Sequence, residues 1–257
     1  MLLDCKYIEA LSPFAVTEIL NTVDSTNIYA KTYLTNNRPL SYVCLAEKQT
    51  AARGRYGKVW QSGIGNINLS CAIGVSAISK VQALSLAVGV ILINFLKQYI
   101  HTDSIKVKWP NDLLYVEKDN YKTSAKLAGI LIELVNNYAI IGIGLNIQPQ
   151  YNDSIKQPIT SLTEILNTPV DINKLVTNLL QNVHHYLEIF MQTGFRYFQY
   201  SWNQNNAFQD KMIKVIKNQE ELLCGTCVGV NVQGQLLIAI SNNIHTIDDI
   251  SLSISLK

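Results

Sequence analysis

The chain has 257 residues, which is enough for one large domain or for a domain with a small companion. With 48% hydrophobic and 16% charged residues it can build a sizeable core, which excludes the disordered class. The formal net charge of +2 is too small to predict nucleic-acid binding, so any electrostatic function must come from local clusters.

The first predicted helix begins near Asp24, where Asp24-Ser25-Thr26-Asn27 precedes a helix-compatible run from Ile28 to Leu34. The apolar run 43–46 predicts a buried strand that leads into a basic loop. A turn at 63–66, followed by alternating residues, predicts a second strand that reaches Ser70.

The most apolar segment, 81–100, predicts a buried amphipathic helix rather than a membrane span. Its apolar residues follow helical spacing, and polar side chains such as Asn94 and Lys97 interrupt it. Ser79 and Gln82 resemble a capping box at the start of this helix.

Two pairs of strands are expected next. Residues 105–116 form two short strands divided by the turn Pro110-Asn111-Asp112. The near-continuous apolar runs 126–135 and 138–147, joined by Asn136-Asn137, predict a central hairpin that is buried on both faces.

The remainder divides into a helical part and a strand-rich part. We expect a short helix at 162–166, a long helix capped by Asp171, and another helix at 195–202. After residue 207, five short apolar runs separated by turns predict a small β-barrel. We therefore predict one domain over residues 1–206 and a second over 207–257.

The cysteines and the N-terminus indicate a cytoplasmic protein. Residues 1–6 lack the apolar core of a secretory signal. Five scattered cysteines disfavour a disulfide framework. Cys224 and Cys227 form a lone CxxC pair without the partners of a zinc site, so we interpret them as half-buried strand thiols.

Four polar clusters lie at the edges of predicted strands. They are Ser25-Thr26-Asn27, the loop from Gln49 to Trp60, the segment Lys108 to Asp112, and Lys126 beside Gly129. Singly, each is explained by a helix cap, a solvated loop, a turn or a surface cation. The loop is distinctive because it is rich in cations and free of acids, and guanidinium groups match phosphate and carboxylate oxygens in pairs.

In this order the clusters resemble the motifs of biotin protein ligases, which adenylate biotin and attach it to a lysine of a carrier protein. The resemblance runs from about Asn21 to Asn146, and weakly to the C-terminus. Its five motifs are Ser25-Thr26-Asn27, Arg53 to Lys58, Lys108 to Asp112, Lys126 to Leu131, and Gly142 to Asn146. It implies an α+β fold, with a central mixed sheet flanked by helices as in class II synthetases, and a C-terminal SH3-like β-barrel.

The resemblance implies a biotin site. Ser25, Thr26 and Gln49 match positions that hydrogen-bond the ureido ring, whose donors and acceptor suit hydroxyl and amide groups. The Arg-rich loop would close over biotin and its adenylate. The implied biotin-binding residues are Ser25, Thr26, Asn27, Gln49, Arg53, Gly54, Arg55 and Gly129.

It also implies a nucleotide site and a two-step reaction with biotin, ATP and Mg²⁺. Lys126 and Arg55 would stabilise charge at the α-phosphate. Asp112 would bind the metal or accept the proton of the acceptor amine, and the sequence leaves both roles open. The implied nucleotide-binding residues are Arg55, Lys58, Trp60, Lys108, Trp109, Asn111, Lys126 and Asn146.

Two positions depart from the family pattern. Ala52 stands where a glycine is common, and it would be strained if that position needs a positive φ. Lys58 stands where arginine is common, so a bidentate contact would be lost. We expect the chemistry to survive because Arg53, Arg55 and Lys126 are kept.

The implied partner is the biotin carboxyl carrier protein or domain of a biotin-dependent carboxylase. The resemblance also implies a possible homodimer formed through a sheet edge. Since about twenty residues precede Asp24, we expect a short form without an N-terminal DNA-binding domain, and neither a nucleic-acid nor a membrane partner. Two alternatives stay open. A lipoate–protein ligase shares the fold, although lipoate has no ureido group for Gln49. A non-catalytic biotin-binding regulator would not need Arg55 and Lys126.

Overall fold

The computed structural model describes residues 2–76, 81, 83–100, 103–117, 124–149, 157–217 and 220–257. The helices are α1 (Cys5–Leu11), α2 (Thr26–Asn36), α3 (Leu84–Leu96), α4 (Leu162–Leu166), α5 (Ile172–Thr193) and α6 (Arg196–Gln204), with the 3-10 turn η1 (Arg55–Gly57). The first seven strands are β1 (Val16–Val23), β2 (Ser41–Gln49), β3 (Ile67–Gly74), β4 (Ile105–Lys108), β5 (Asp112–Tyr115), β6 (Ala125–Val135) and β7 (Tyr138–Leu145). The last five are β8 (Met212–Lys217), β9 (Glu220–Val230), β10 (Leu236–Ile240), β11 (Asn243–Ile247) and β12 (Ser253–Leu256).

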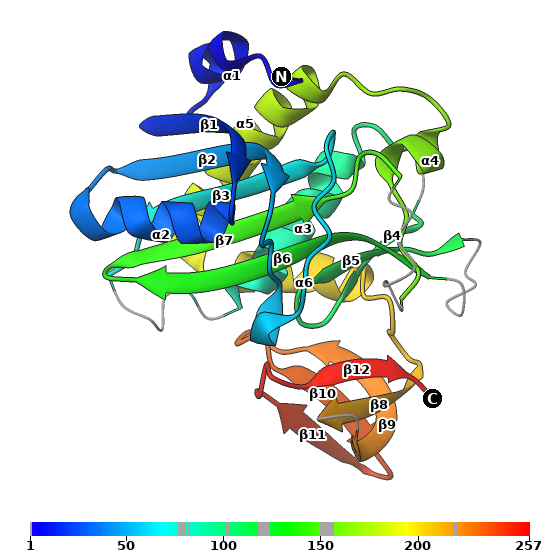
Figure 1. Ribbon diagram of the computed structural model, residues 1–257. Coiled ribbons are helices and arrows are strands. Elements are labelled where there is room, and N and C mark those ends of the chain that lie inside the picture. Colours follow the sequence, from blue (N-terminus) through cyan, green and yellow to red (C-terminus); the bar gives the residue numbers. More distant parts are fainter. Residues whose placement is uncertain are drawn as a thin grey trace.

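These elements form two sheets (Figure 1). The larger sheet has the strand order β1-β2-β3-β7-β6-β5-β4, and the smaller has the order β11-β10-β9-β8-β12. β1 runs parallel to β2, whereas the other neighbours in the larger sheet are antiparallel. The predicted central mixed sheet is therefore confirmed, and the second antiparallel sheet is consistent with the predicted SH3-like domain.

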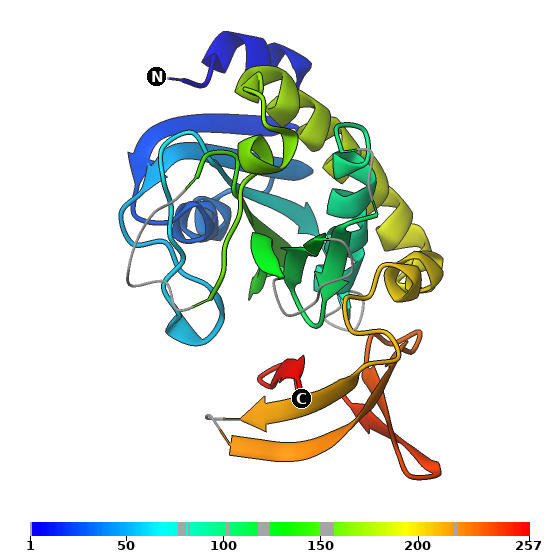
Figure 2. The same ribbon diagram turned by 90° about the vertical axis from the view of Figure 1, so that its right-hand side faces the viewer.

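Helices cover both faces of the larger sheet (Figure 2). α2 packs on one face against β2, β3 and β7, and α3 packs on the other against β4, β5 and β6. α5 and α6 cover the outer side of α3. Because α3 is enclosed on both sides, its sequence is apolar around nearly its whole circumference.

No helix in the part of the chain that the structure describes combines the length and apolar character needed to cross a membrane.

Local capping explains where the later helices begin. Asp171 accepts hydrogen bonds from the backbone N–H groups of Asn173 and Lys174 and starts α5 at the predicted place. Ser161 and Glu164 form a reciprocal capping box that starts α4.

Some predicted elements need correction. α3 begins at Leu84 rather than at Val81, and its N-cap residue Ala83 has a φ of 60° without a side-chain cap. The predicted capping box of Ser79 and Gln82 lies outside the described residues. In the central hairpin, β7 is buried almost throughout, but β6 is only partly buried. α1 and β1 were not predicted.

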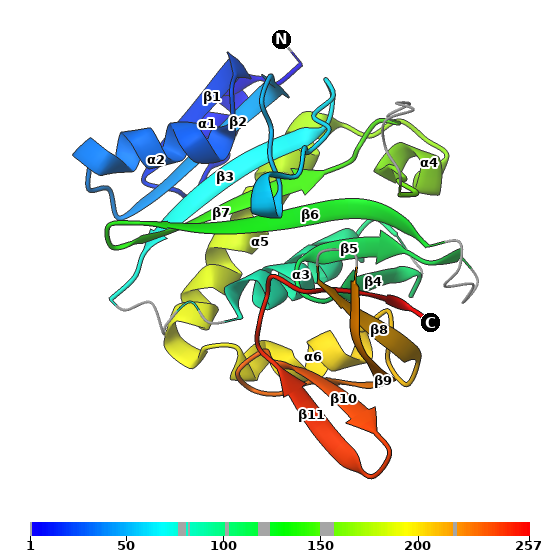
Figure 3. The same cartoon turned by 60° about the horizontal axis from the view of Figure 1, so that its bottom comes forward.

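The smaller sheet is attached at the β4 edge of the larger one. After α6, the chain pairs with β4: Val107 N donates to Asn205 O at 2.9 Å, and Ala207 N donates to Val107 O at 2.8 Å. Trp109 Nε1 donates at 3.2 Å to Gly234 O, in the turn between β9 and β10 of the smaller sheet. The smaller sheet lies on the side of the molecule where β4 and β5 form the edge of the larger sheet (Figure 3). The predicted division at 206/207 falls inside this paired segment and stays a prediction.

The cysteine thiols provide a test of the packing. The five cysteines, all within the described ranges, form no disulfide, and burial raises the pKa of Cys44 to about 12. Burial also raises the pKa of Cys71 and of Cys227. Since the thiolate is the reactive form, we expect maleimide at about pH 8 to modify only Cys5 and Cys224 in the folded protein. Peptide mass spectrometry would locate the adducts, and labelling of Cys44 before unfolding would contradict the packing.

Candidate functional site

A cavity of about 250 Å³ lies where the basic loop, the start of α2, strands β5 to β7 and the end of the smaller sheet meet. Every predicted site residue lines it except Asn146. The lining includes Ser25, Thr26, Asn27, Gln49, Arg53, Gly54, Arg55, Lys58, Trp60, Lys108, Trp109, Asn111, Asp112, Lys126 and Gly129. The structure therefore brings together clusters that lie up to about a hundred residues apart in the chain.

The basic loop is a small closed hairpin. Arg53 and Val59 pair as an antiparallel bridge, and Gly54 N donates to Lys58 O at 2.7 Å. Its tip is η1, and the ordered backbone holds the loop arginines over the cavity.

Ala52 is not strained. The positive φ values of the loop belong to Tyr56, at 56°, and Gly57, at 70°, whereas Ala52 stays outside the left-handed region. Ala52 is buried, and its carbonyl accepts a hydrogen bond from Trp60 N at 3.1 Å. The strain considered for an alanine at this position therefore does not arise.

One wall of the cavity is lined by a row of neutral side chains, those of Thr26, Asn27 and Gln49, which contact Asn68 and Ser70 of β3 outside the lining. The backbone N–H of Thr26 donates to Gln49 Oε1 at 2.9 Å, and the Thr26 hydroxyl lies 3.1 Å from the same oxygen. Gln49 Nε2 donates to Asn68 Oδ1 at 3.2 Å. Ser70 Oγ lies 2.7 Å from Thr26 Oγ1 and 2.6 Å from Asn27 Oδ1. These contacts hold the donors and acceptors of the wall in one arrangement.

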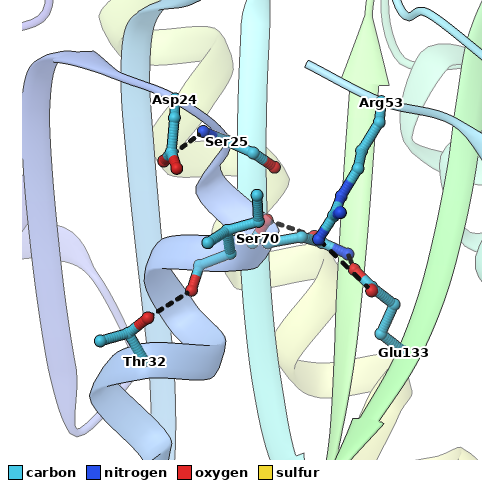
Figure 4. Close-up of polar contacts among 8 residues, drawn as sticks. Asp24, Ser25, Thr32, Arg53, Ser70 and Glu133 are labelled. Carbon is cyan, nitrogen blue, oxygen red and sulfur yellow. Dashed lines mark hydrogen bonds and ion pairs between the residues drawn. The ribbon is translucent and has the colours of Figure 1, made fainter. Parts of the chain in front are cut away.

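Ser25 lies beside this row, and no hydrogen bond of its hydroxyl is found among the described residues. It is the N-cap residue of α2 but makes no side-chain cap bond, and its backbone N–H donates to Asp24 Oδ1 at 2.6 Å (Figure 4). Its hydroxyl is therefore available to a ligand in the cavity.

A second wall is charged. Lys126 Nζ lies 2.7 Å from Asp112 Oδ1, and the two side chains are only 15% and 18% exposed. The same ammonium group lies 5.3 Å from the ring centre of Trp60. A register shift in the pairing of β5 with β6 brings Lys126 onto the face occupied by Gly129. The ammonium is thereby fixed at the cavity.

Arg55 joins the loop to the turn between β4 and β5. Its Nη1 donates to Asn111 Oδ1 at 2.9 Å, and Asn111 Nδ2 donates to Ile130 O at 2.9 Å. At the end of β4, burial lowers the pKa of Lys108; the attraction of Asp112 opposes this shift, and repulsion from Lys126 and Lys58 adds to it. The cavity thus concentrates cations whose repulsion an anionic ligand would relieve.

Glycines on β6 and β7 let side chains lie flat on the sheet. A Cβ at Gly144 would lie 2.4 Å from the Trp60 ring, and one at Gly129 would lie 2.9 Å from it. A Cβ at Gly142 would lie 2.4 Å from Asn27 Oδ1. These positions therefore exclude larger residues.

Gly142→Ala is expected to displace the Asn27 amide and to lower the free energy of unfolding by about 1–3 kcal/mol, because hydrogen bonds to Ser70 and Glu133 hold the amide that the new Cβ would meet. Urea unfolding measures this change. Gly74→Ala is the matched control, since a Cβ at Gly74 would meet no atom of the described residues within 4 Å, its chain neighbours aside. Equal stability of the two variants would contradict the described packing.

Asn146 has a different position from its predicted companions. Its side chain is buried outside the cavity lining, and Nδ2 donates to the carbonyls of Lys126 at 3.3 Å and Thr160 at 3.1 Å. It braces the strand that carries Lys126, and direct contact with a nucleotide stays a prediction.

Several residues at the site were missed by sequence reasoning. Asn68 and Ser70 are polar residues within β3, and Glu133 is the only acid in the run 126–135. A polar residue within an apolar strand could have indicated that these positions belong near a site. The segment 251–254 also lines the cavity, but it lies far along the chain from the other clusters and carries no distinctive residue pattern. Among the described residues, no group of three or more His, Cys, Asp or Glu side chains could hold a metal ion.

Comparison with known proteins agrees with this geometry. Residues 19–146 match the model of the biotin/lipoate A/B protein ligase family. The chain is 32% identical over 246 residues to the bifunctional ligase/repressor BirA of Salmonella typhimurium, covering 92% of this chain and 73% of that protein. It is also 32% identical over 147 residues to the biotin–[acetyl-CoA-carboxylase] ligase of Mycobacterium tuberculosis, covering 55% of this chain and 52% of that protein.

The fold is similar to that of a solved structure. The biotin protein ligase from Aquifex aeolicus in complex with biotin and ATP superposes with a TM-score of 0.83 at 25% identity. The match covers 95% of this chain and 100% of that chain, so it includes both sheets.

Proposed function

This chain belongs to the biotin protein ligase family, and on that premise we propose that it activates biotin with ATP and transfers the biotinyl group to a lysine of a biotin carboxyl carrier protein or domain. The observation that carries the proposal is the pairing of two unlike walls in one cavity. The neutral row around Thr26 and Gln49 suits a ureido ring, and the cations Arg55 and Lys126 suit a carboxylate and a phosphate.

In the first step, the biotin carboxylate attacks the α-phosphorus of ATP, which yields biotinyl-5′-AMP and pyrophosphate. Both reactants are anionic, so their electrostatic repulsion raises the activation barrier of this step. Lys126, fixed by Asp112, and Arg55, fixed by Asn111, would lower it by balancing the charge that develops at phosphorus. Holding both reactants in one cavity would add the advantage of proximity.

In the second step, the ε-amine of the acceptor lysine attacks the biotinyl carbonyl and AMP leaves. The amine must lose a proton. Asp112 is the only carboxylate among the described lining residues, so we propose it as the acceptor or as the group that orients the amine.

The donor set is compatible with Mg²⁺ bound mainly through phosphates. Mg²⁺ keeps several waters and often takes one or two carboxylates together with substrate phosphates. Asp112, with the neighbouring amide of Asn111, would supply the protein side of such a site. When bound, Mg²⁺ would screen the charge of the phosphates.

We further propose that the protein acts in the cytoplasm, and that the smaller sheet, residues 207–257, forms a domain that completes the cavity. Its segment 251–254 contributes to the lining, which supports a role near the nucleotide or the docked carrier. Homodimerisation stays a prediction.

The test is pyrophosphate release from ATP with either biotin or lipoate. We expect release with biotin and none with lipoate, and trapped biotinyl-5′-AMP by mass spectrometry. Lipoyl-AMP without biotinyl-AMP would favour a lipoate–protein ligase. Biotin binding without any pyrophosphate release would favour the non-catalytic regulator.

A further inference from the structure

Glu133 connects two parts of the site although it belongs to none of the predicted motifs. Its Oε2 accepts a hydrogen bond from Asn27 Nδ2 at 2.7 Å, and its Oε1 lies 3.9 Å from Nη2 of Arg53 (Figure 4). The Glu133 side chain is 27% exposed. One carboxylate on β6 therefore bridges the start of α2 and the basic loop.

The contact with Glu133 decides which way the Asn27 amide points. A carboxylate only accepts hydrogen bonds, so the NH₂ group of Asn27 must face it and Oδ1 must face away. Asn27 Oδ1 lies 2.6 Å from Ser70 Oγ and has no proton to give. Ser70 must therefore donate its hydroxyl proton to Asn27.

The donor direction of these hydrogen bonds also determines what the Thr26 hydroxyl can offer. Once the proton of Ser70 is used, Ser70 Oγ can only accept from Thr26 Oγ1, 2.7 Å away. Thr26 therefore donates either to Ser70 or to Gln49 Oε1, at 3.1 Å. In both cases Thr26 can offer only a lone pair to a molecule in the cavity, and a ureido N–H group is a donor that fits it.

The second contact of Glu133 acts on the loop. The 3.9 Å pair joins two partly exposed side chains, and an ion pair of this kind is weak. Arg53 is thus held near the cavity but can leave Glu133 for the carboxylate of a ligand.

We propose that Glu133 is a positioning residue for biotin. Through Asn27 and Ser70 it orients the Thr26 hydroxyl to accept a ureido N–H group, and it keeps Arg53 of the loop within reach. This inference rests on the proposed function.

The experiment measures the Kd of biotin and of ATP separately by titration calorimetry. Glu133→Ala is expected to weaken biotin binding by about tenfold or more while ATP binding is unchanged, because a charge-assisted hydrogen bond is lost on the biotin side alone. Glu133→Gln, whose amide oxygen can still accept from Asn27, is expected to keep more of the biotin affinity than the alanine variant. Glu188→Ala is the matched control, because it removes an equally long 3.9 Å pair with His184 on α5.

A double-mutant cycle separates positioning from a general structural effect. In an Asn27→Ala background, the loss of biotin affinity caused by Glu133→Ala is expected to shrink. An equal loss in both backgrounds, an equal loss for biotin and ATP, or no loss would overturn the inference while leaving the proposed function standing. Failure of the unmutated protein to bind biotin would overturn both.

Discussion

Replacing Lys126 with alanine is expected to slow biotin-dependent formation of the adenylate by about 10²-fold or more. The ammonium of Lys126 lies 2.7 Å from Asp112, and both side chains are mostly buried at the cavity. Its loss removes a positive charge from the reacting phosphate and leaves an unbalanced carboxylate that repels the nucleotide. Biotin-dependent exchange of pyrophosphate into ATP measures the rate.

Two further variants identify the cause. Lys97→Ala removes a lysine from another ion pair, 3.8 Å from Asp103, and is expected to leave the rate unchanged. Adding Asp112→Asn to Lys126→Ala is expected to leave the rate low, because removing the carboxylate does not replace the stabilising cation. A normal rate in Lys126→Ala would remove this residue from the mechanism.

Arg55→Ala is expected to release biotinyl-5′-AMP about 10- to 100-fold faster, since a charge-assisted hydrogen bond contributes about 1.5–3 kcal/mol. The guanidinium donates to Asn111 at 2.9 Å and thereby joins the loop to the turn between β4 and β5. Without it the loop would no longer enclose the adenylate, and activated biotin would reach lysines of unrelated proteins. Release of isotope-labelled adenylate after dilution measures the rate, and biotin on a bystander protein reports the escape.

Arg38→Ala is the matched control for this prediction. Arg38 donates to Leu34 O at 2.7 Å at the end of α2, away from the cavity lining. If both arginine variants released the adenylate as slowly as the unmutated protein, the loop would not act as a lid.

The parts of the fold that were predicted correctly depend on features that act over short distances. Asp171 and the turn at Pro110 start or stop elements through local hydrogen bonds and fixed φ angles, so the sequence was sufficient to locate them. Each polar cluster could be recognised from the sequence because its residues are close together in the chain. That the clusters meet in one cavity was implied only by the family resemblance, because β5, β6 and β7 acquire their neighbours from the sheet topology.

What was missed depends on contacts between distant residues. Glu133 looks like an ordinary strand residue until Asn27 and Arg53 are folded against it, more than seventy residues from either in the chain. Ala52 appeared to be a position at risk of strain, but the sharp turn of the loop is made by Tyr56 and Gly57. Backbone angles in an irregular loop follow from its closure, which a single residue does not reveal.

The most direct test of the central claim is the transfer itself. The purified protein would be mixed with biotin, ATP, Mg²⁺ and a biotin carboxyl carrier domain, and the carrier's mass would be measured. We predict the mass increase of one biotinyl group, located on a single lysine and absent when biotin or ATP is omitted. A carrier whose mass does not change, in a reaction where an authentic ligase modifies it, would contradict the assignment.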